Sequence, residues 1–264
     1  MSVQTADREI RIEDMPGLGA SEAMELARGQ MDALIKQLKE LDPQDWEKPT
    51  DCDRWAVRDI VAHVVGWAEA LPSPKEMMRL SKGTRAVRKE LGAKLDAQNE
   101  AQVIARRHMS PEQLIAAFET AGDRFLRMRR IGGLVGKPLP FYNPAVGLTT
   151  LGFLMSSIFT RDHFMHRIDI ARATGRELEL GESEKRVVDD VVRHWGRSSK
   201  ADALLRLTGP VGGNFVCGSG GRADIKGDAL EFCRVLAGRA EPEAMEIEGD
   251  RLAATRWLAA HVPF

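Results

Sequence analysis

The stretch TRDHFMHRIDIARATG, residues 160–175, sets two acids and two histidines in a segment that otherwise has the pattern of a core helix. This pattern predicts one long helix from about Leu148 to Ala173, ended by Gly175. Wound at about 100° per residue, the helix places apolar and polar side chains together on a face roughly 80° wide. The face consists of Leu148, Leu151, Met155, Phe159, Asp162, His166, Asp169 and Ala173. A carboxylate buried there needs compensation by a charge, by hydrogen bonds or by a metal.

Asp162 and His166 are four residues apart, so their side chains lie on one helix face and can converge on a single ion. An acid and a base at this spacing are more often structural, and both interpretations stay open at this point. Asp169 lies one turn beyond His166, where it would hold the imidazole N–H or pair with Arg167. His163 points about 100° away from this face and is predicted to be a surface histidine.

His63 is the candidate for a third ligand. It lies in a second predicted helix, at the edge of the apolar stripe and beside Ile60 and Trp67. A lone histidine in such a place is usually a core residue with its hydrogen bonds satisfied. Together with Asp162 and His166, however, it completes a set of two imidazoles and a carboxylate. Three protein ligands with an open fourth position are typical of catalytic zinc, although nickel, manganese and ferrous iron accept the same ligands.

The first 178 residues are predicted to be mainly helical. Amphipathic helices are expected at residues 21–41, 56–71, 110–130 and 148–173, enough for an up-down four-helix bundle. Residues 75–108 are charged and have no clear period, so only broken helix is predicted there. Residues 131–147 are rich in glycine and proline and are predicted to form a long loop, a candidate wall or lid of a site.

The pattern changes after Gly175. Short runs of β-forming residues alternate with helical segments, and the predicted strands are residues 203–209, 213–218, 223–227 and 244–249. Strands mixed with helices after an all-helical half indicate a separate domain. We therefore expect an α+β two-domain protein, with a four-helix bundle in residues 1–178 and a small α+β domain in residues 179–264.

The composition indicates which binding partners and which cellular compartment to expect. A formal net charge of −1 gives no reason to expect nucleic acid or an anionic membrane. Three widely spaced cysteines favour a reducing cytoplasm over a disulfide framework. The N-terminus lacks an apolar signal core, and the longest apolar run, residues 146–159, is shorter than the roughly 18 residues of a membrane span. One basic cluster is predicted to be a solvated helix end, with an anion patch as the alternative: Arg124, Arg127, Arg129 and Arg130.

Three segments resemble one known family. The sequence DWEKPTDCDRWAVRDIVAHVVGWAE, residues 45–69, resembles the N-terminal signature of the mycothiol-dependent maleylpyruvate isomerase family in the DinB-like superfamily. Residues 160–175 resemble its second signature, a carboxylate-x-x-x-His-Arg-x-Asp motif. Residues 225–259 resemble the α+β domain, related to sterol carrier proteins, that commonly follows. The likeness extends from about residue 25 to about residue 260.

This resemblance implies a DinB-like bundle that holds a divalent metal, usually zinc, through His63, Asp162 and His166. The family has glutamate where this chain has Asp162, which is one methylene shorter. The ion would therefore sit closer to the helix, bind more weakly or use a bridging water. The family's second domain offers an arginine for a substrate carboxylate or a thiol cofactor, and Arg239 is the match, with a solvated surface arginine as an equal alternative.

The resemblance also implies a reaction. A metal-bound low-molecular-weight thiol, mycothiol in the named enzyme, adds to the double bond of an unsaturated acid, the new single bond rotates, and elimination leaves the trans isomer. Related members transfer the thiol to electrophiles. We expect an enzyme of one of these kinds, with maleylpyruvate as one candidate substrate, acting on small molecules as a monomer or homodimer. The alternatives are a non-catalytic protein that binds a small molecule or lipid, and a metal-dependent hydrolase on the same bundle.

Overall fold

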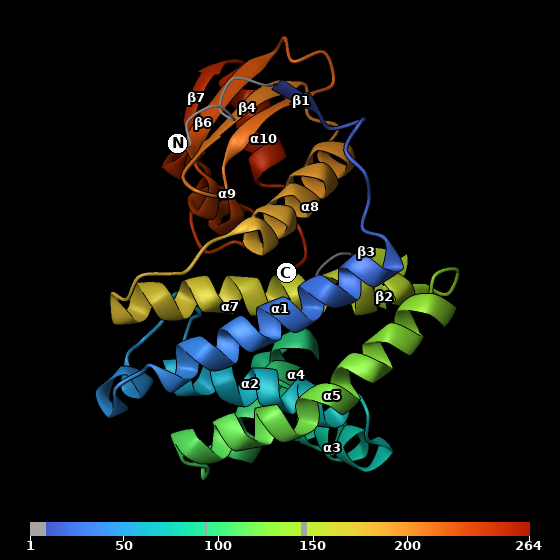
Figure 1. The fold of residues 1–264 in the computed structure, drawn as a ribbon, viewed down its shortest axis with the longest axis vertical. Helices are drawn as coiled ribbons and strands as arrows, with labels where there is room; N and C mark the ends of the chain where they lie inside the picture. The colour runs from blue at the N-terminus through green and yellow to red at the C-terminus, as the bar shows by residue number, and fades with distance from the viewer. Residues whose placement is uncertain (1–8, 93, 144–146) are drawn as a thin grey trace. The chain divides into compact units, whose positions relative to one another are not determined.

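The computed structural model describes residues 9–92, 94–143 and 147–264, which divide into two compact units (Figure 1). One unit comprises residues 20–178. The other joins residues 179–264 to residues 9–19, which the sequence-based division assigns to the first domain. The division differs because β1 (Glu9–Arg11) pairs in parallel with β5 (Gly213–Cys217). With three residues, β1 is too short to give a periodic signal in the sequence.

The helical unit contains the predicted four-helix bundle. Its helices are α1 (Ala20–Lys39), α2 (Val57–Ala70), α5 (Pro111–Val135) and α7 (Phe159–Thr174), with the short helix η1 (Pro43–Glu47) between α1 and α2. Helices α1 and α2 each pack against both α5 and α7. The bundle core is apolar and includes Leu34, Ile60, Val64, Phe118 and Phe125. Together with the sheet-containing unit, this confirms the α+β two-domain fold class.

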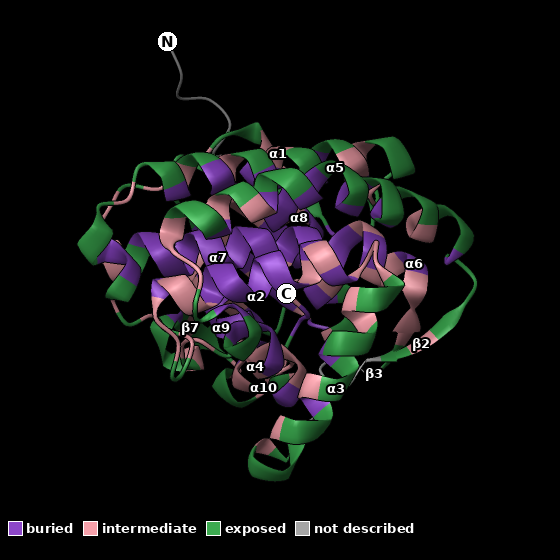
Figure 2. Cartoon of the chain, turned by 90° about the horizontal axis from the view of Figure 1, so that it is seen from below, coloured by how far each residue is buried: buried purple, intermediate pink, exposed green. Residues whose placement is uncertain are grey.

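Helix α7 is buried on nearly all of its faces. Of its 16 residues, 12 are buried, as the colours of Figure 2 show along its length. The prediction that His163 lies on the surface is therefore wrong: it is 1% exposed, with its ring 5.6 Å from that of Phe118 and 6.1 Å from that of Phe125. Hydrophobic periodicity predicts a single buried face for each helix, whereas α7 lies inside the bundle and contacts several elements at once.

The charged segment after α2, where broken helix is predicted, forms two regular helices with an interruption at Gly92. They are α3 (Pro74–Leu91) and α4 (Lys94–Arg106), which pack against each other, and α4 also packs against α2. Ser73 caps α3, and Gly92 ends it with a φ of 71°, which glycine adopts without strain. Helix α3 buries few of its side chains, with Leu80 and Thr84 its buried residues.

The predicted long loop is largely ordered. Helix α5 continues to Val135, and β2 (Pro140–Asn143) pairs antiparallel with β3 (Gly147–Thr150), while residues 144–146 of the predicted loop lie outside the described residues. The predicted start of the last bundle helix at Leu148 is also wrong, because Leu148 is a strand residue that is 79% exposed. Two short segments lead from the hairpin into α7: α6 (Leu151–Phe153) and a π-helical turn (Leu154–Ile158).

The second unit is a mixed sheet with helices. Its later strands match the predicted ones, and the sheet order is β1-β5-β4-β6-β7. The remaining elements are α8 (Glu182–Ser199), β4 (Ala203–Thr208), β6 (Ala223–Asp228), α9 (Ala229–Leu236), η3 (Pro242–Ala244), β7 (Glu246–Gly249) and α10 (Arg251–Leu258). Strand β4 alternates buried and less buried residues, and the rings of Trp195 and Phe232 meet edge to face at 5.2 Å in the core.

None of the helices in the described part of the chain combines the length and the apolar character that a membrane crossing requires.

Asp45 in η1 joins this short helix to the residues that follow α7. Its carboxylate, 3% exposed, lies 2.8 Å from the Lys48 ammonium and 2.7 Å from the Arg176 guanidinium. The hydrogen bond from Lys48 is the main cause that lowers the pKa of Asp45, and Arg176 lowers it further, whereas burial raises it. The result is a fall in this pKa from 3.8 to about 2. Because the folded pKa lies below the unfolded one, Asp45 stabilises the protein above pH 3.8, and that contribution is lost as the pH falls towards 2.

We therefore predict that Asp45→Asn lowers the free energy of unfolding at pH 7 by about 1 to 2 kcal/mol, less than the full linkage value because both cations are partly exposed. The loss should shrink between pH 4 and pH 2. Denaturant unfolding at several pH values measures both effects, with the exposed neighbour Asp53→Asn as the control. Equal pH dependence in the wild type and Asp45→Asn would contradict this account.

Candidate metal centre

The three predicted ligands meet where α2 packs against α7. His63 comes from the middle of α2, and Asp162 and His166 come from the first half of α7. Both imidazoles are nearly inaccessible, at 4% and 3% exposure, whereas the Asp162 side chain is 19% exposed. The cluster is thus buried on its histidine side and reaches solvent beside Asp162.

The ligand atoms are spaced as they would be around one ion. Oδ1 of Asp162 lies 3.4 Å from Nε2 of His166 and 3.7 Å from Nε2 of His63. The ligand atoms of all three residues lie within 4.8 Å of one another. Zinc bonds of about 2.1 Å in a tetrahedral arrangement separate neighbouring ligands by about 3.4 Å. This spacing is compatible with a single divalent ion, and the Asp162 side chain is long enough to lie at these distances from both imidazoles.

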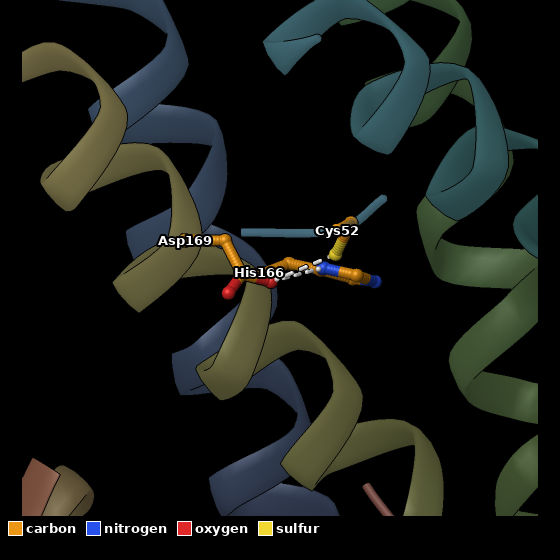
Figure 3. Close-up of side chains that lie close together, drawn as sticks. All are labelled: Cys52, His166 and Asp169. Carbon is orange, nitrogen blue, oxygen red and sulfur yellow. Dashed lines mark hydrogen bonds and ion pairs between the residues drawn. The ribbon is translucent and has the colours of Figure 1, made fainter. Parts of the chain in front are cut away.

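Asp169 orients the ring of His166. Its Oδ2 accepts a hydrogen bond from Nδ1 of His166 at 3.0 Å and a second one from the Cys52 thiol at 3.4 Å (Figure 3). The carboxylate requires a proton on Nδ1, so Nε2 is the nitrogen available to a cation. Cys52, His166 and Asp169 also form a group with metal-ligating atoms. The 3.0 Å contact between Nδ1 of His166 and Oδ2 of Asp169 has the length of a hydrogen bond between these two groups.

Gln102 has the corresponding role at His63. It lies on α4, is 1% exposed, and its Oε1 is 2.7 Å from Nδ1 of His63. Sequence reasoning missed this residue because α4 was not expected as a helix. The only signal in the sequence is weak: Ala97 and Ala101, both buried, are small residues four apart on that helix.

Asp162 and His166 depend on each other electrostatically. Burial raises the pKa of Asp162, but the adjacent His166 and His63 outweigh it and hold that pKa well below its ordinary value. Burial lowers the pKa of His166, and the Asp162 carboxylate outweighs it and raises that pKa well above the ordinary value. The site therefore holds an ionised carboxylate that requires positive charge beside it.

One arginine of the basic cluster belongs to this region. The cluster is not a helix end, because α5 continues to Val135, so that prediction is wrong. Arg124, Arg127 and Arg130 are exposed, but Arg129 is 0% exposed. Arg129 lies four residues after the buried Phe125, on the inner face of α5, and contacts Met155 and Thr160 near the start of α7.

Arg129 places a second positive charge near Asp162. Its Nε donates to the carbonyl oxygen of Met155 at 2.9 Å, and its Nη2 donates to Oγ1 of Thr160 at 2.6 Å. Met155 lies in the π-helical turn, where the altered backbone register changes which carbonyls are available. Burial lowers the pKa of Arg129 to about 9, and the charge of Asp162 opposes that shift.

Arg239 is the remaining predicted site residue. It lies in the sheet-containing unit, after the end of α9, where it is half-buried. Its carbonyl oxygen accepts a hydrogen bond from Nη2 of Arg234 at 3.1 Å. Its assignment to a substrate carboxylate or thiol stays a prediction.

Comparisons with known proteins agree with the predicted family. A solved mycothiol-dependent maleylpyruvate isomerase is 17% identical, with a TM-score of 0.55, and the match covers 87% of this chain and 92% of that one. A histidine-to-alanine mutant of such an enzyme matches over the same shares of both chains, with 17% identity and a TM-score of 0.54. At this identity the likeness establishes the fold. No curated protein matches.

The family model described as the mycothiol maleylpyruvate isomerase N-terminal domain matches residues 27–171. That segment contains α2, α5 and nearly all of α7, and therefore His63, Asp162 and His166. The match covers more than half of the 264 residues, so the protein belongs to the mycothiol maleylpyruvate isomerase N-terminal domain family.

Proposed function

We propose that the protein is a metal-dependent enzyme that uses a low-molecular-weight thiol, such as mycothiol, to isomerise an unsaturated acid or to transfer the thiol to an electrophile. Zinc is the metal that the ligand set favours, and maleylpyruvate is a candidate substrate. The observation that carries this proposal is the convergence of His63, Asp162 and His166 at distances of 3.4 and 3.7 Å, with both Nδ1 atoms engaged elsewhere.

The charges of the site suit an anionic sulfur. Two neutral imidazoles and one carboxylate leave a divalent ion with a net charge of about +1. When bound, the ion would stabilise the thiolate form of a thiol near neutral pH, which is the nucleophilic form. The Asp162 carboxylate holds the positive charge in place, and Asp169 and Gln102 keep the protons of both imidazoles on Nδ1.

The surroundings of the site support small-molecule chemistry. His63 and His166 are buried, and the ring of Trp67 contacts that of Phe159 at 5.6 Å on the same side of α7, so the interior beside the ligands is largely apolar. In such surroundings a charged group interacts more strongly than it does in water. Asp162 is the most exposed of the three ligands and marks the side from which a thiol and an acid would enter.

We predict that His63→Ala and His166→Ala each abolish stoichiometric zinc binding, because each removes one of three protein ligands. Elemental analysis of purified protein and calorimetric zinc titration measure this, with affinity expected to fall by more than about 100-fold, beyond the effect of losing an outer hydrogen-bond partner. His108→Ala, at an exposed position after α4, is the control. Equal zinc content in the wild type and the three variants would refute the proposed metal site.

The ligand role of Asp162 has its own test. Asp162→Asn keeps the shape but removes the charge, and we expect zinc affinity to fall by more than about 100-fold. Asp162→Glu keeps a carboxylate of the kind found in the family, and we expect affinity within about tenfold of the wild type. Competition with a chromogenic chelator compares the three proteins. Wild-type affinity in Asp162→Asn would mean that the carboxylate is not a ligand.

The reaction is tested with the zinc-loaded protein, a low-molecular-weight thiol and maleylpyruvate. We expect the absorbance change of cis-trans isomerisation, or thiol consumption with an added electrophile, to require both the metal and the thiol. Removal of zinc by a chelator should abolish the activity, and adding zinc back should restore it. Hydrolysis of an ester with no need for thiol would instead identify a hydrolase, and a protein without bound metal would identify a non-catalytic binding protein.

A further inference from the structure

Helix α4 holds His63 through a single buried amide. Oε1 of Gln102 lies 2.7 Å from Nδ1 of His63, and the two side chains are 1% and 4% exposed. Nε2 of Gln102 has no hydrogen-bond partner among the described residues. A buried amide with one end bonded to an imidazole and the other end unpaired is costly, which indicates that the contact with His63 outweighs that cost.

The chemistry of the amide decides which tautomer His63 adopts. A carbonyl oxygen only accepts, so Oε1 of Gln102 requires a proton on Nδ1, and Nε2 is the ring nitrogen on the side of Asp162. If the amide were reversed, its NH₂ group would donate to Nδ1, and the proton would move to Nε2, where it would block a cation. The orientation of Gln102 is therefore coupled to the ability of His63 to bind a metal.

Gly66 makes the approach of Gln102 possible. It lies three residues after His63, on the same side of α2. A Cβ at Gly66 would lie 2.6 Å from both Cβ and Cγ of Gln102, a distance that packed atoms do not reach. Glycine inside a helix costs about 1 kcal/mol relative to alanine, so the space it leaves is the physical reason for its presence here. The aliphatic part of Gln102 occupies that space.

Two further contacts join α4 to the region around His63. Nη2 of Arg106 pairs with Glu69 at 2.5 Å, one turn beyond Gly66 on α2. Nε1 of Trp55 donates to Glu100 at 3.2 Å, and the Trp55 ring lies 5.2 Å from the ring of His63. The imidazole is thus held at Nδ1 by one residue of α4 and on its face by a tryptophan that another residue of α4 orients.

We infer that Gln102, seated against Gly66, is a positioning residue that sets the tautomer and ring orientation of His63 for metal binding. The part that concerns the metal rests on the proposed function. The part that concerns the tautomer of His63 does not rest on that function, because the hydrogen bond to Gln102 needs no ion.

The first test measures metal affinity. Gln102→Leu should weaken binding of zinc or cobalt by about 10-fold to 100-fold and change the visible spectrum of the cobalt form. Gln102→Glu, which still accepts from Nδ1, should stay within about tenfold of the wild type. Gly66→Ala should resemble Gln102→Leu. Gly133→Ala is its matched control, a glycine of helix α5 whose added Cβ would meet Cβ of Ser156 at 4.0 Å, an ordinary contact.

The second test reads the tautomer in metal-free protein. Nitrogen NMR shifts of the His63 ring, recorded at about pH 8.5 where an ordinary imidazole is neutral, should indicate a proton on Nδ1 in the wild type and in Gln102→Glu. The preference should be lost in Gln102→Leu and Gly66→Ala. Circular dichroism checks that each variant is folded, and Gln102→Glu and Gly66→Ala remain informative if Gln102→Leu is not.

The outcomes separate the two proposals. If no protein binds metal but the tautomer follows residue 102, the proposed function fails and the positioning role of Gln102 stands. If the wild type binds metal and Gln102→Leu has equal affinity and the same tautomer, the positioning role is overturned and the metal site stands.

Discussion

An ionised carboxylate inside a helical bundle is the constraint on which this structure depends. Asp162 lies on a helix that is buried along most of its length, so its charge requires positive partners within a few ångströms. Three other helices supply the surrounding groups. His63 comes from α2 and Arg129 from α5, and Gln102 of α4 lies behind His63. The bundle is therefore organised around one charge as well as around an apolar core.

Both imidazoles and the buried Arg129 are held by hydrogen bonds to other residues. Asp169 accepts from His166, Gln102 accepts from His63, and the π-helical turn before α7 offers the Met155 carbonyl to Arg129. Such contacts restrict the rotation of buried side chains, which lowers the entropy lost when a ligand binds. The most accessible part of the cluster is the Asp162 side chain, whereas both imidazoles are buried.

Local sequence patterns predicted most of the fold and singled out three side chains that the structure brings together. The strands of the second unit alternate clearly, and His63, Asp162 and His166 stand out because each is polar on a stripe that is otherwise apolar. Other elements escaped because their signals are short or weak: β1 has three residues, and α3 buries few of its side chains. His163 and Arg129 were assigned to the surface because periodicity treats each helix as if it had a single buried face.

The amino-acid sequence was sufficient to place two imidazoles and a carboxylate on the inner faces of two helices, because helical spacing is a local property. Only the tertiary structure could bring these atoms to 3.4 and 3.7 Å, bury 12 of the 16 residues of α7 and show that Gly66 leaves room for Gln102 to reach His63. The physical reason is that separations between helices depend on how side chains from distant segments pack, and no single segment encodes that packing.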